Sequence, residues 1–408
     1  MKKIMIIGAG DFQLPLVKKA SEKYFVILVA PVIANVFKEY IDESLLVDVR
    51  DKETILAFAK EKRIDGVITD QTDISVRTVA YVAEQMGLPG IGYGTGCLFT
   101  DKSLMRKKLI EIGVKQLPNK TVFSKEEALE YYDEIGGNVI IKPLDTQGSR
   151  GVQACCDKDD LIAKYDATSK WSSNNAVIVE RLATGREFVV EGLAYNYEFK
   201  NLICGDTFYF DIPDAYAAKN RIFPSDADVD LYQKVCDLNT KIITGFGLKQ
   251  GISHSEFIMD GEDVYLIETA ARGGGVFISS DLINLSTGLC TEEFLIDIAL
   301  GQIDSIPKIQ PQQCACGYMA FYVPMGEIIS VDGKDEIINL PYVHHHQLDN
   351  VYVGKLISHG QVDKTSRVAI IVSGKDRSEL FERMELIKSI LKVDVKTDAG
   401  DIQTLIWE

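Results

Sequence analysis

The sequence predicts a multidomain fold of mixed α/β and α+β class. Its 408 residues are enough for two to four packed units, each with its own core. A hydrophobic content of 46% and a charged content of 25% are typical of a soluble globular protein. Short apolar strands alternate with helical patterns in residues 1–96, whereas strands follow one another directly in later parts of the chain, so we expect more than one kind of sheet.

Residues 1–96 are predicted to form the first domain, a parallel sheet with helices on both faces. The opening MKKIMIIGAG is expected to be a buried strand and not a signal peptide, because Gly8 and Asp11 interrupt its apolar run. A dinucleotide-binding turn is not favoured, since Gln13 stands where its third glycine would be. Further strands are expected at Phe25–Ala30, Leu45–Val49 and Gly66–Thr69, and helices at Asp51–Lys62 and Ile74–Met86.

Residues 97–312 are predicted to form a second, larger domain. A glycine-rich stretch, Leu88–Gly96, is expected to be the linker that precedes it. The helix predicted over Lys102–Ile112 ends at Gly113, a residue type common just past a helix. A compact unit is then expected over residues 117–193, followed by a long helix and a hairpin. The elements expected before the hairpin are strands at Lys120–Phe123, Ala176–Arg181 and Glu187–Ala194, and helices at Lys125–Glu134, from Lys158 onward, and at Leu231–Phe246.

The stretch Val139–Gly151, VIIKPLDTQGSRG, is predicted to bind a nucleotide phosphate. Lys142 ends a buried strand beside a flexible loop, where it supplies a fixed positive charge. The backbone of Gly148, Ser149 and Gly151 can approach phosphate oxygens closely. The stretch is not a Walker loop, because it lacks that pattern of glycines followed by lysine. A plain hairpin without a ligand is the alternative.

A second hairpin carries two candidate metal ligands. Strands at Ser253–Met259 and Asp263–Glu268 are joined by the turn Asp260-Gly-Glu-Asp. Glu256 and Glu268 are expected to share one sheet face, where unpaired like charges would be costly. A divalent cation such as Mg²⁺, which prefers carboxylate and phosphate oxygens, removes that cost. A pair of exposed edge-strand glutamates is the alternative.

Arg272 follows this hairpin and leads into three consecutive glycines. An arginine leaving a strand directly after a metal-binding carboxylate is placed to hold an anionic oxygen in a bidentate fork. A structural salt bridge is the other interpretation of Arg272.

Residues 313–408 are predicted to form a small α+β domain. They contain the apolar segment Gly317–Tyr322 and the run SRVAIIVSGKDRSELFERMELIKSIL, which predicts a strand followed by a helix. His344, His345 and His346 are consecutive, and in an extended segment they point to alternate sides, so at most two of them can converge on a metal. The spacing of Cys314-Ala-Cys316 does not fit a zinc knuckle.

Charge and cysteine content exclude several classes of function. The net charge of −16 argues against a general nucleic-acid-binding protein, since a phosphate backbone selects a basic surface. No apolar run reaches membrane-spanning length. The eight cysteines are too sparse for a secreted disulfide scaffold, so we expect reduced thiols and a cytoplasmic protein.

Four of these stretches, in this order along the chain, resemble the ATP-grasp superfamily: TDKSLMRKKL, VIIKP with its glycine loop, VIVERL with GREFVVEG, and HSEF with YLIETAAR. The resemblance is to the branches typified by the carbamoyl-phosphate synthetase large chain, biotin carboxylase and the amino-acid ligases. It implies a Rossmann-like N-terminal domain, an ATP-grasp lid at about residues 117–194 with a catalytic sheet, and a C-terminal domain that completes the catalytic core. ATP is then expected between two antiparallel sheets.

The resemblance also implies roles for individual residues. The family commonly has an asparagine where this chain has Ala270, so one oxygen ligand of the metal is missing and water is expected to replace it. The implied roles are Lys102 and Lys142 on the ATP phosphates, Gly148–Gly151 as a flap over them, Glu180 and Leu182 at the adenine, Glu187 on the ribose, Glu256 and Glu268 on Mg²⁺ or Mn²⁺, Arg272 on an acyl phosphate, and Lys219 and Arg221 toward the γ-phosphate or the substrate.

The implied activity is that of an ATP-dependent carboxylate–amine ligase, which forms an acyl phosphate and releases ADP and phosphate. Its partners would be ATP, a small carboxylic acid and an amine, and a homodimer is left open. Substrate contacts are expected from loops at residues 206–225 and 274–289. Two alternatives remain: a bicarbonate-dependent carboxylase or carbamoyl-phosphate-synthetase-like enzyme, and a non-catalytic ATP-binding regulatory protein, which Ala270 favours.

Overall fold

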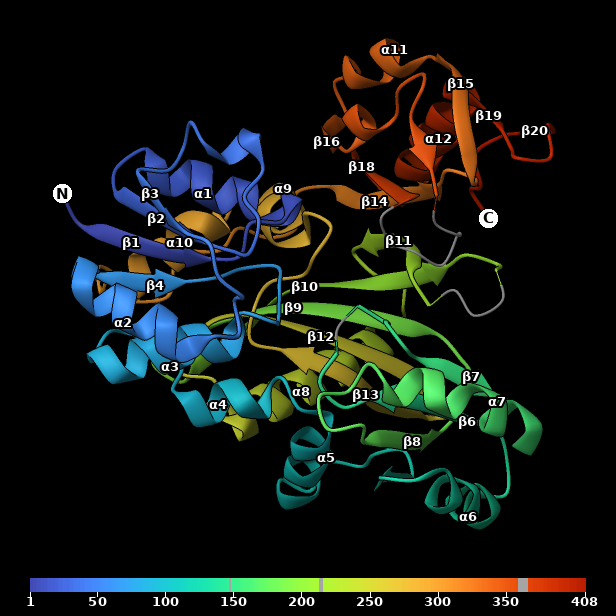
Figure 1. The fold of residues 1–408 in the computed structure, drawn as a ribbon, viewed down its shortest axis with the longest axis horizontal. Coiled ribbons are helices and arrows are strands. Elements are labelled where there is room, and N and C mark those ends of the chain that lie inside the picture. Colours follow the sequence, from blue (N-terminus) through green and yellow to red (C-terminus); the bar gives the residue numbers. More distant parts are fainter. Residues whose placement is uncertain (147, 213–215, 359–365) are drawn as a thin grey trace.

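The computed structural model describes residues 1–146, 148–212, 216–358 and 366–408. Within these ranges the strands form four sheets, one of them parallel and the others antiparallel (Figure 1). The predicted mixed α/β and α+β class is therefore confirmed. Among the described helices, none is long and apolar enough to span a membrane.

The N-terminal unit is a parallel sheet in the order β3-β2-β1-β4, coloured blue in Figure 1. As predicted, its first strand precedes a glycine turn, and Asp51 begins the second helix by accepting a hydrogen bond from the Thr54 N–H. The bounds are β1 Lys3–Ile7, η1 Asp11–Gln13, α1 Leu14–Ser21, β2 Phe25–Val29, η2 Asn35–Phe37, β3 Glu43–Leu45, α2 Lys52–Lys62, β4 Gly66–Ile68 and α3 Val76–Met86.

Two predictions for this unit were wrong in detail. The third strand was expected at Leu45–Val49, but it lies at Glu43–Leu45, where it pairs with β2, and it leaves the sheet edge after Leu45. The expected linker Leu88–Gly96 contains the start of a helix, α4 (Tyr93–Leu98). The Glu84 carboxylate accepts a hydrogen bond from the Tyr93 N–H at 2.8 Å, which satisfies one free donor at the start of this helix despite its glycines.

A small antiparallel sheet with two helices on it follows. Its order is β5-β8-β6-β7, and an apolar cluster that includes Val122, Leu161 and Val179 lies between the sheet and the helices. Strands β6 and β7 pair directly, so the glycine loop is the connection of a hairpin. The bounds are α5 Lys102–Glu111, β5 Asn119–Val122, α6 Lys125–Ile135, β6 Val139–Pro143, β7 Gln153–Cys155, α7 Lys158–Ser169 and β8 Val177–Arg181.

An antiparallel sheet of eight strands runs through the middle of the molecule (Figure 1). Its order is β13-β12-β9-β10-β11-β14-β18-β16, and helix α8 packs against β10. The bounds are β9 Glu187–Tyr195, β10 Glu198–Tyr209, β11 Ala218–Phe223, α8 Val229–Phe246, β12 Gln250–Asp260, β13 Asp263–Ala270, β14 Ala315–Tyr322, β16 Val343–His346 and β18 Arg367–Gly374.

Both segments that were predicted as substrate loops contain regular structure. Residues 206–225 include the end of β10 and all of β11, whose Ile222 and Phe223 are fully buried in the sheet, and residues 213–215 of this prediction lie outside the described ranges. Residues 274–289 contain a π-helix, η3 (Ile278–Leu282), and α9 (Ile283–Thr287).

The C-terminal residues extend this sheet and add a smaller one. Strands β14, β18 and β16 continue the eight-stranded sheet, while the small sheet has the order β17-β15-β19-β20 and lies at the upper right of Figure 1. Helix α12 packs on β18 and β14. The remaining bounds are α10 Thr291–Ala299, β15 Gly326–Asp332, α11 Lys334–Ile338, η4 Leu348–Asn350, β17 Leu356–Ile357, α12 Arg377–Ile390, β19 Lys392–Lys396 and β20 Ile402–Gln403.

A buried carboxylate joins the central sheet to the C-terminal helix α12. Asp206 accepts hydrogen bonds from Arg186 at 2.7 Å and from Ser225 at 2.7 Å, and Arg377 lies 2.9 Å from its other oxygen. Asp206 is only 2% exposed, so its charge depends on these partners.

We expect Asp206→Ala to lower the free energy of unfolding by about 3–5 kcal/mol, because Arg186 and Arg377 lose their buried carboxylate partner and keep the exposed Asp226. Chemical denaturation measures this directly. Asp226→Ala is the matched control, since Asp226 binds the same two arginines from an exposed position and its loss should cost less than about 1 kcal/mol. Equal losses for the two variants would contradict this assignment.

Candidate active site

Lys142 lies at the end of β6, as the sequence predicts, and it forms a buried ion pair. Its Nζ is 2.6 Å from one oxygen of Glu180, and the Arg106 Nε is 2.6 Å from the other. Burial alone would raise the pKa of Glu180, but Arg106 and Lys142 lower it to about 2. Glu180 therefore stays charged and holds Lys142 in place beside the glycine loop.

Lys102 joins the hairpin of β12 and β13 to the glycine loop between β6 and β7. Its Nζ donates to the Thr146 carbonyl at 2.9 Å and lies 3.3 Å from Glu268, while its backbone N–H donates to the Leu144 carbonyl. The Lys102 side chain is 6% exposed, whereas that of Glu268 is 33% exposed. The ammonium group of Lys102, at the start of α5, thus links the glycine loop of the small β5-β8-β6-β7 sheet to Glu268 of the eight-stranded sheet.

Glu187 begins β9 and accepts a hydrogen bond from the Tyr209 hydroxyl at 2.6 Å. Burial, together with the neighbouring Glu256, raises the pKa of Glu187 to about 7 against the opposing effect of this hydrogen bond. The carboxyl group is therefore poised to change its protonation near neutral pH.

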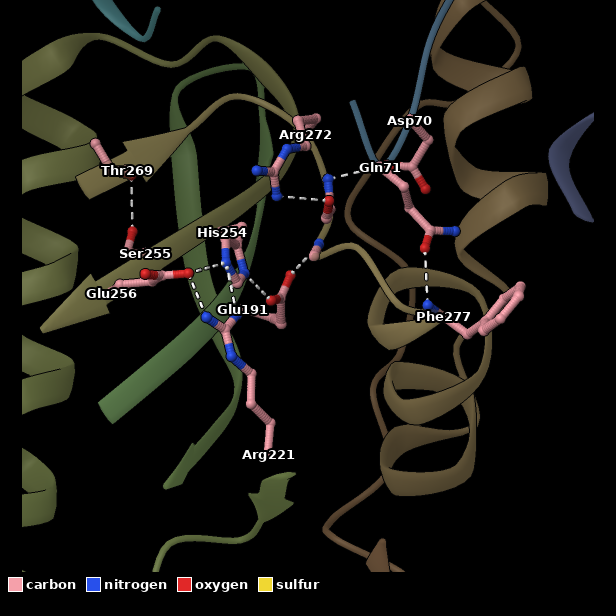
Figure 2. Close-up of polar contacts among 12 residues, drawn as sticks. Asp70, Gln71, Glu191, Arg221, His254, Ser255, Glu256, Thr269, Arg272 and Phe277 are labelled. Carbon is pink, nitrogen blue, oxygen red and sulfur yellow. Dashed lines mark hydrogen bonds and ion pairs between the residues drawn. The ribbon is translucent and has the colours of Figure 1, made fainter. Parts of the chain in front are cut away.

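Four charged side chains form a chain of contacts across strands β9, β11 and β12 (Figure 2). His254 contacts Glu191 through Nδ1, and its Nε2 lies 3.1 Å from Glu256 and 3.0 Å from Arg221. Arg221 also forms an ion pair with Glu256. Burial favours the neutral form of His254, but Glu191 and Glu256 outweigh it and raise the pKa of His254.

Glu256 stays ionised in this chain of contacts. Burial alone would raise its pKa, yet Arg221 and His254 hold the pKa of Glu256 well below its usual range. The carboxylate is thus available as an anionic ligand at neutral pH, with its charge balanced by Arg221 on β11 and by His254 on its own strand, β12.

Arg272 connects β13 to the N-terminal unit. Its Nε and Nη2 each donate to a different oxygen of Asp73 at 2.8 Å, and its Nη1 donates to the Gly273 carbonyl. Burial would lower the pKa of Arg272, but Asp73 raises it. In this structure Arg272 forms a bidentate ion pair with a protein carboxylate, as the salt-bridge interpretation expects, and its contact with an acyl phosphate stays a prediction.

The glycines after Arg272 are also held by carboxylates. The Gly273 N–H donates to Asp70 at 2.8 Å, and the Gly274 N–H donates to Glu191 at 3.0 Å (Figure 2). Both glycines are required by close packing, since a Cβ on Gly273 would lie 2.1 Å from the Ser279 Oγ and one on Gly274 would lie 2.5 Å from a Glu191 oxygen. The loop backbone is thus fixed against the central sheet and the N-terminal unit.

The residues present fit a divalent cation that is shared with a ligand. Glu256 and Glu268 lie directly opposite each other in the register of β12 and β13. Among the described residues no group of three or more His, Cys, Asp or Glu side chains could hold a metal, so the chain itself offers these two carboxylates. Mg²⁺ commonly binds through one or two carboxylates together with phosphate oxygens and water.

Three predicted site residues have partners outside the charged contacts described above. Lys219 forms an ion pair with Glu408 and not with Glu268. The Leu182 N–H donates to the Asn138 carbonyl at 2.9 Å, and the Ser149 hydroxyl donates to the Tyr216 carbonyl at 2.9 Å. Gly148 and Gly151 both have positive φ, and residue 147 of the predicted flap lies outside the described ranges.

Sequence analysis missed several residues of the site: Asp70, Asp73, Arg106, Glu191 and His254. An acidic residue inside the apolar run of β9 is a signal that could have identified Glu191, because a buried carboxylate needs a partner. Asp70 and Asp73 follow β4, at the carboxyl edge of a parallel sheet, where functional residues gather. His254 stands two positions before Glu256 and so shares its strand face.

Comparisons with known proteins find one matching family model and several similar proteins. Residues 135–281 match the model of the ATP-grasp domain. The chain is 25% identical over 285 residues to the alanine–anticapsin ligase of Bacillus subtilis, a match that covers 65% of this chain and 60% of that protein. It is 24% identical over 369 residues to the phosphoribosylamine–glycine ligase of Methanosarcina acetivorans, which covers 82% of this chain and 80% of the relative.

A solved structure extends the likeness to nearly the whole fold. The L-amino acid ligase from Bacillus licheniformis superimposes with a TM-score of 0.81 at 19% identity, covering 96% of this chain and 98% of that one. At this identity the superposition shows a shared fold, and the roles of individual residues remain to be argued from the site.

We expect Glu187→Gln to become more stable relative to the wild type as pH rises. The folded-state pKa of Glu187 is raised to about 7, so ionising this group disfavours the folded protein, and the penalty grows from about pH 5 to reach roughly 3 kcal/mol above pH 7. Denaturation of both proteins at pH 5, 6, 7 and 8 measures the difference. Glu198→Gln, on an exposed glutamate of β10, is the control. A difference that does not grow with pH would contradict the burial of a protonated Glu187.

Proposed function

We propose that this chain is an ATP-dependent carboxylate–amine ligase, because its residues 135–281 match the ATP-grasp domain. The observation that supports this most strongly is the position of Glu256 and Glu268, which face each other on β12 and β13. Lys102 contacts Glu268 and the glycine loop together, so a phosphate held by that loop would lie close to both carboxylates.

The chain's own cations would bind the triphosphate. Lys102 donates to the Thr146 carbonyl at the start of the glycine loop, and Lys142 precedes this loop on β6, where Glu180 keeps it oriented. Glu256 and Glu268 would hold Mg²⁺ or Mn²⁺, which when bound neutralises phosphate charge. Glu187 would accept a hydrogen bond from the ribose. Glu180 and Leu182 would border the adenine through their backbone groups, because the Glu180 carboxylate is already paired with Lys142 and Arg106.

The proposed reaction has two steps. An oxygen of the substrate carboxylate attacks the γ-phosphorus of ATP, the bond from that phosphorus to the bridging oxygen breaks, and ADP leaves. The amine nitrogen then attacks the acyl carbon, the bond from carbon to the phosphate oxygen breaks, and phosphate departs while the amine proton passes to solvent. No nucleophilic side chain is needed, so the protein contributes position and charge.

Arg221 and Arg272 are the cations nearest to where the acyl group would form. Both are already paired, with Glu256 and Asp73 respectively, which keeps each guanidinium oriented before substrate arrives. An arginine with one edge of its fork bound to a carboxylate retains further N–H groups for an anionic oxygen. Lys219, which pairs with Glu408, has a weaker claim to contact substrate.

Amino acids are the substrate class that we favour. The alanine–anticapsin ligase and the L-amino acid ligase are named for such substrates, and the superposition on the second covers nearly the whole of both chains. A bicarbonate-dependent carboxylase is the second candidate from the same fold. A regulatory ATP-binding protein is the third, and Ala270 is the observation that favours it.

The first test is the identity of the products. We expect ATP to be converted to ADP and phosphate when a pool of amino acids is supplied, and hydroxylamine to trap the activated acid as a hydroxamate in equal amount. Mass spectrometry of pooled reactions identifies the acid. Formation of AMP would contradict transfer of the γ-phosphoryl group, while turnover with bicarbonate alone would favour the carboxylase.

The second test concerns the metal ligands. We expect Glu268→Gln to reduce phosphate release at least about 100-fold, because the amide keeps the side-chain shape but loses the charge that a cation needs. Glu262→Gln, in the turn of the same hairpin, is the matched control and should remain active. The shift in melting temperature on adding Mg²⁺ with ATP should shrink in the first variant and persist in the second. Equal activity of both variants would contradict the metal assignment.

A further inference from the structure

The segment Arg272–Leu282, which we call the junction segment, has an unfavourable backbone. Val276 and Phe277 are consecutive non-glycine residues in the left-handed region, with φ of 57° and 60°. This conformation is rare for a β-branched or bulky side chain and is retained only where surrounding contacts determine it. A π-helix follows at once, from Ile278 to Leu282, and π-helical turns occur frequently at functional sites.

The N-terminal unit holds one side of the junction segment. The side-chain oxygen of Gln71 accepts a hydrogen bond from the Phe277 N–H at 3.1 Å (Figure 2). The Gln71 side-chain amide also donates to the Phe12 carbonyl. The Phe12 ring meets the Phe277 ring edge to face, with centroids 5.1 Å apart. Phe277 itself is only 3% exposed.

The C-terminal residues hold the other side through His345. Its ring stacks on the Phe277 ring with centroids 3.7 Å apart and planes inclined by 24°, and its Nδ1 lies 3.4 Å from Asp281. Phe277 is therefore in contact with residues from the first and last parts of the chain together. Among the three consecutive histidines, His345 alone makes these contacts within the described residues.

A β-bulge directs His345 to this position. In the pairing of β16 with β18, Val343 lies opposite Val372 and His345 lies opposite Ile371, so His344 is the extra residue. Bulges redirect side chains and are common near functional sites. His344 points elsewhere, and its Nε2 lies 2.7 Å from the Ser373 hydroxyl in an exposed position.

We propose that His345 is a positioning residue for the substrate side of the site: by stacking on Phe277 it holds the junction segment, and with it Arg272 and Gly273–Gly275, in the arrangement that receives the acyl group. This inference rests on the proposed ligase function. It assigns a role to the histidine run that neither metal binding nor nucleotide binding explains, and it makes the C-terminal residues a direct support of the substrate loop.

The effect should fall on substrate and not on nucleotide. The junction segment contacts the N-terminal unit, Glu191 and His345, whereas the predicted ATP contacts lie on α5, β6, the glycine loop, the end of β8 and Glu187 at the start of β9. Loss of the stacked ring would let Phe277 leave its left-handed conformation, and the glycines before it would follow. The carboxylate or amine would then bind more weakly while ATP binding is kept.

The test compares His345→Ala with His345→Phe, which keeps a stacked ring, and with His344→Ala as the neighbouring control. Hydrogen exchange of the peptide that covers residues 273–282 is measured in all variants without ligand, together with the melting shift caused by Mg²⁺ and ATP. We expect His345→Ala to speed exchange in that peptide at least about tenfold and to keep the melting shift, while the other two variants match the wild type. If His345→Ala does not fold, His345→Gln replaces it with the same expectation.

Steady-state kinetics give the second readout. For His345→Ala we expect the KM of the amino-acid substrate to rise at least about fivefold with the KM of ATP unchanged, and His345→Phe should restore it. A residue that only stabilised the fold would lower kcat with the active fraction and leave both KM values alone. Exchange and KM values equal to those of His344→Ala would overturn the proposal. Absence of ligase activity in the wild type would refute the proposed function, and the exchange result would still decide the role of His345.

Discussion

The bidentate ion pair between Arg272 and Asp73 is the contact on which the geometry of the site depends. It joins the end of β13 to the loop after β4, two parts of the chain that are 199 residues apart. Both side chains are largely buried, so removing either would leave an uncompensated charge at a cost of about 3–5 kcal/mol. The hydrogen bonds from Gly273 and Phe277 to Asp70 and Gln71 depend on the same approach of the N-terminal unit to the central sheet.

Around this contact, three carboxylates of the site each have a cationic neighbour. Glu180 has Lys142 and Arg106, Glu256 has Arg221 and His254, and Glu268 has Lys102. Fully buried ions without such partners would be too costly to keep. The arrangement gives fixed charges at defined places before any ligand arrives, which is the condition for electrostatic catalysis of phosphoryl transfer.

Much of this could be predicted from local patterns. The strand ending at Lys142, the hairpin carrying Glu256 and Glu268, and the helix starting at Lys102 all follow from apolar periodicity and turn residues, and the structure confirms these elements. Local patterns could not supply the partners. That Glu180 would turn its side chain to Lys142, or that Arg272 would meet Asp73, depends on contacts between residues distant in sequence.

The errors have physical causes as well. Residues 206–225 were expected to be a substrate loop because the resemblance implies substrate contacts from variable loops, but β11 lies between β10 and β14 and pairs with both strands. The helix over Tyr93–Leu98 forms despite its glycines because Glu84 supplies an acceptor at its start. In both places tertiary contacts outweigh local propensity.

The proposed ligase reaction requires this site to transfer the γ-phosphoryl group of ATP to a carboxylate. Positional isotope exchange tests it most directly, with ATP carrying heavy oxygen in the bridge between the β- and γ-phosphorus atoms and with the carboxylic acid that supports phosphate release, but no amine. We expect the label to move into the non-bridging β-phosphate positions only when the acid is present, because ADP forms reversibly beside an acyl phosphate. Movement of a label placed in the bridge between the α- and β-phosphorus atoms, with none from the β–γ bridge, would contradict it.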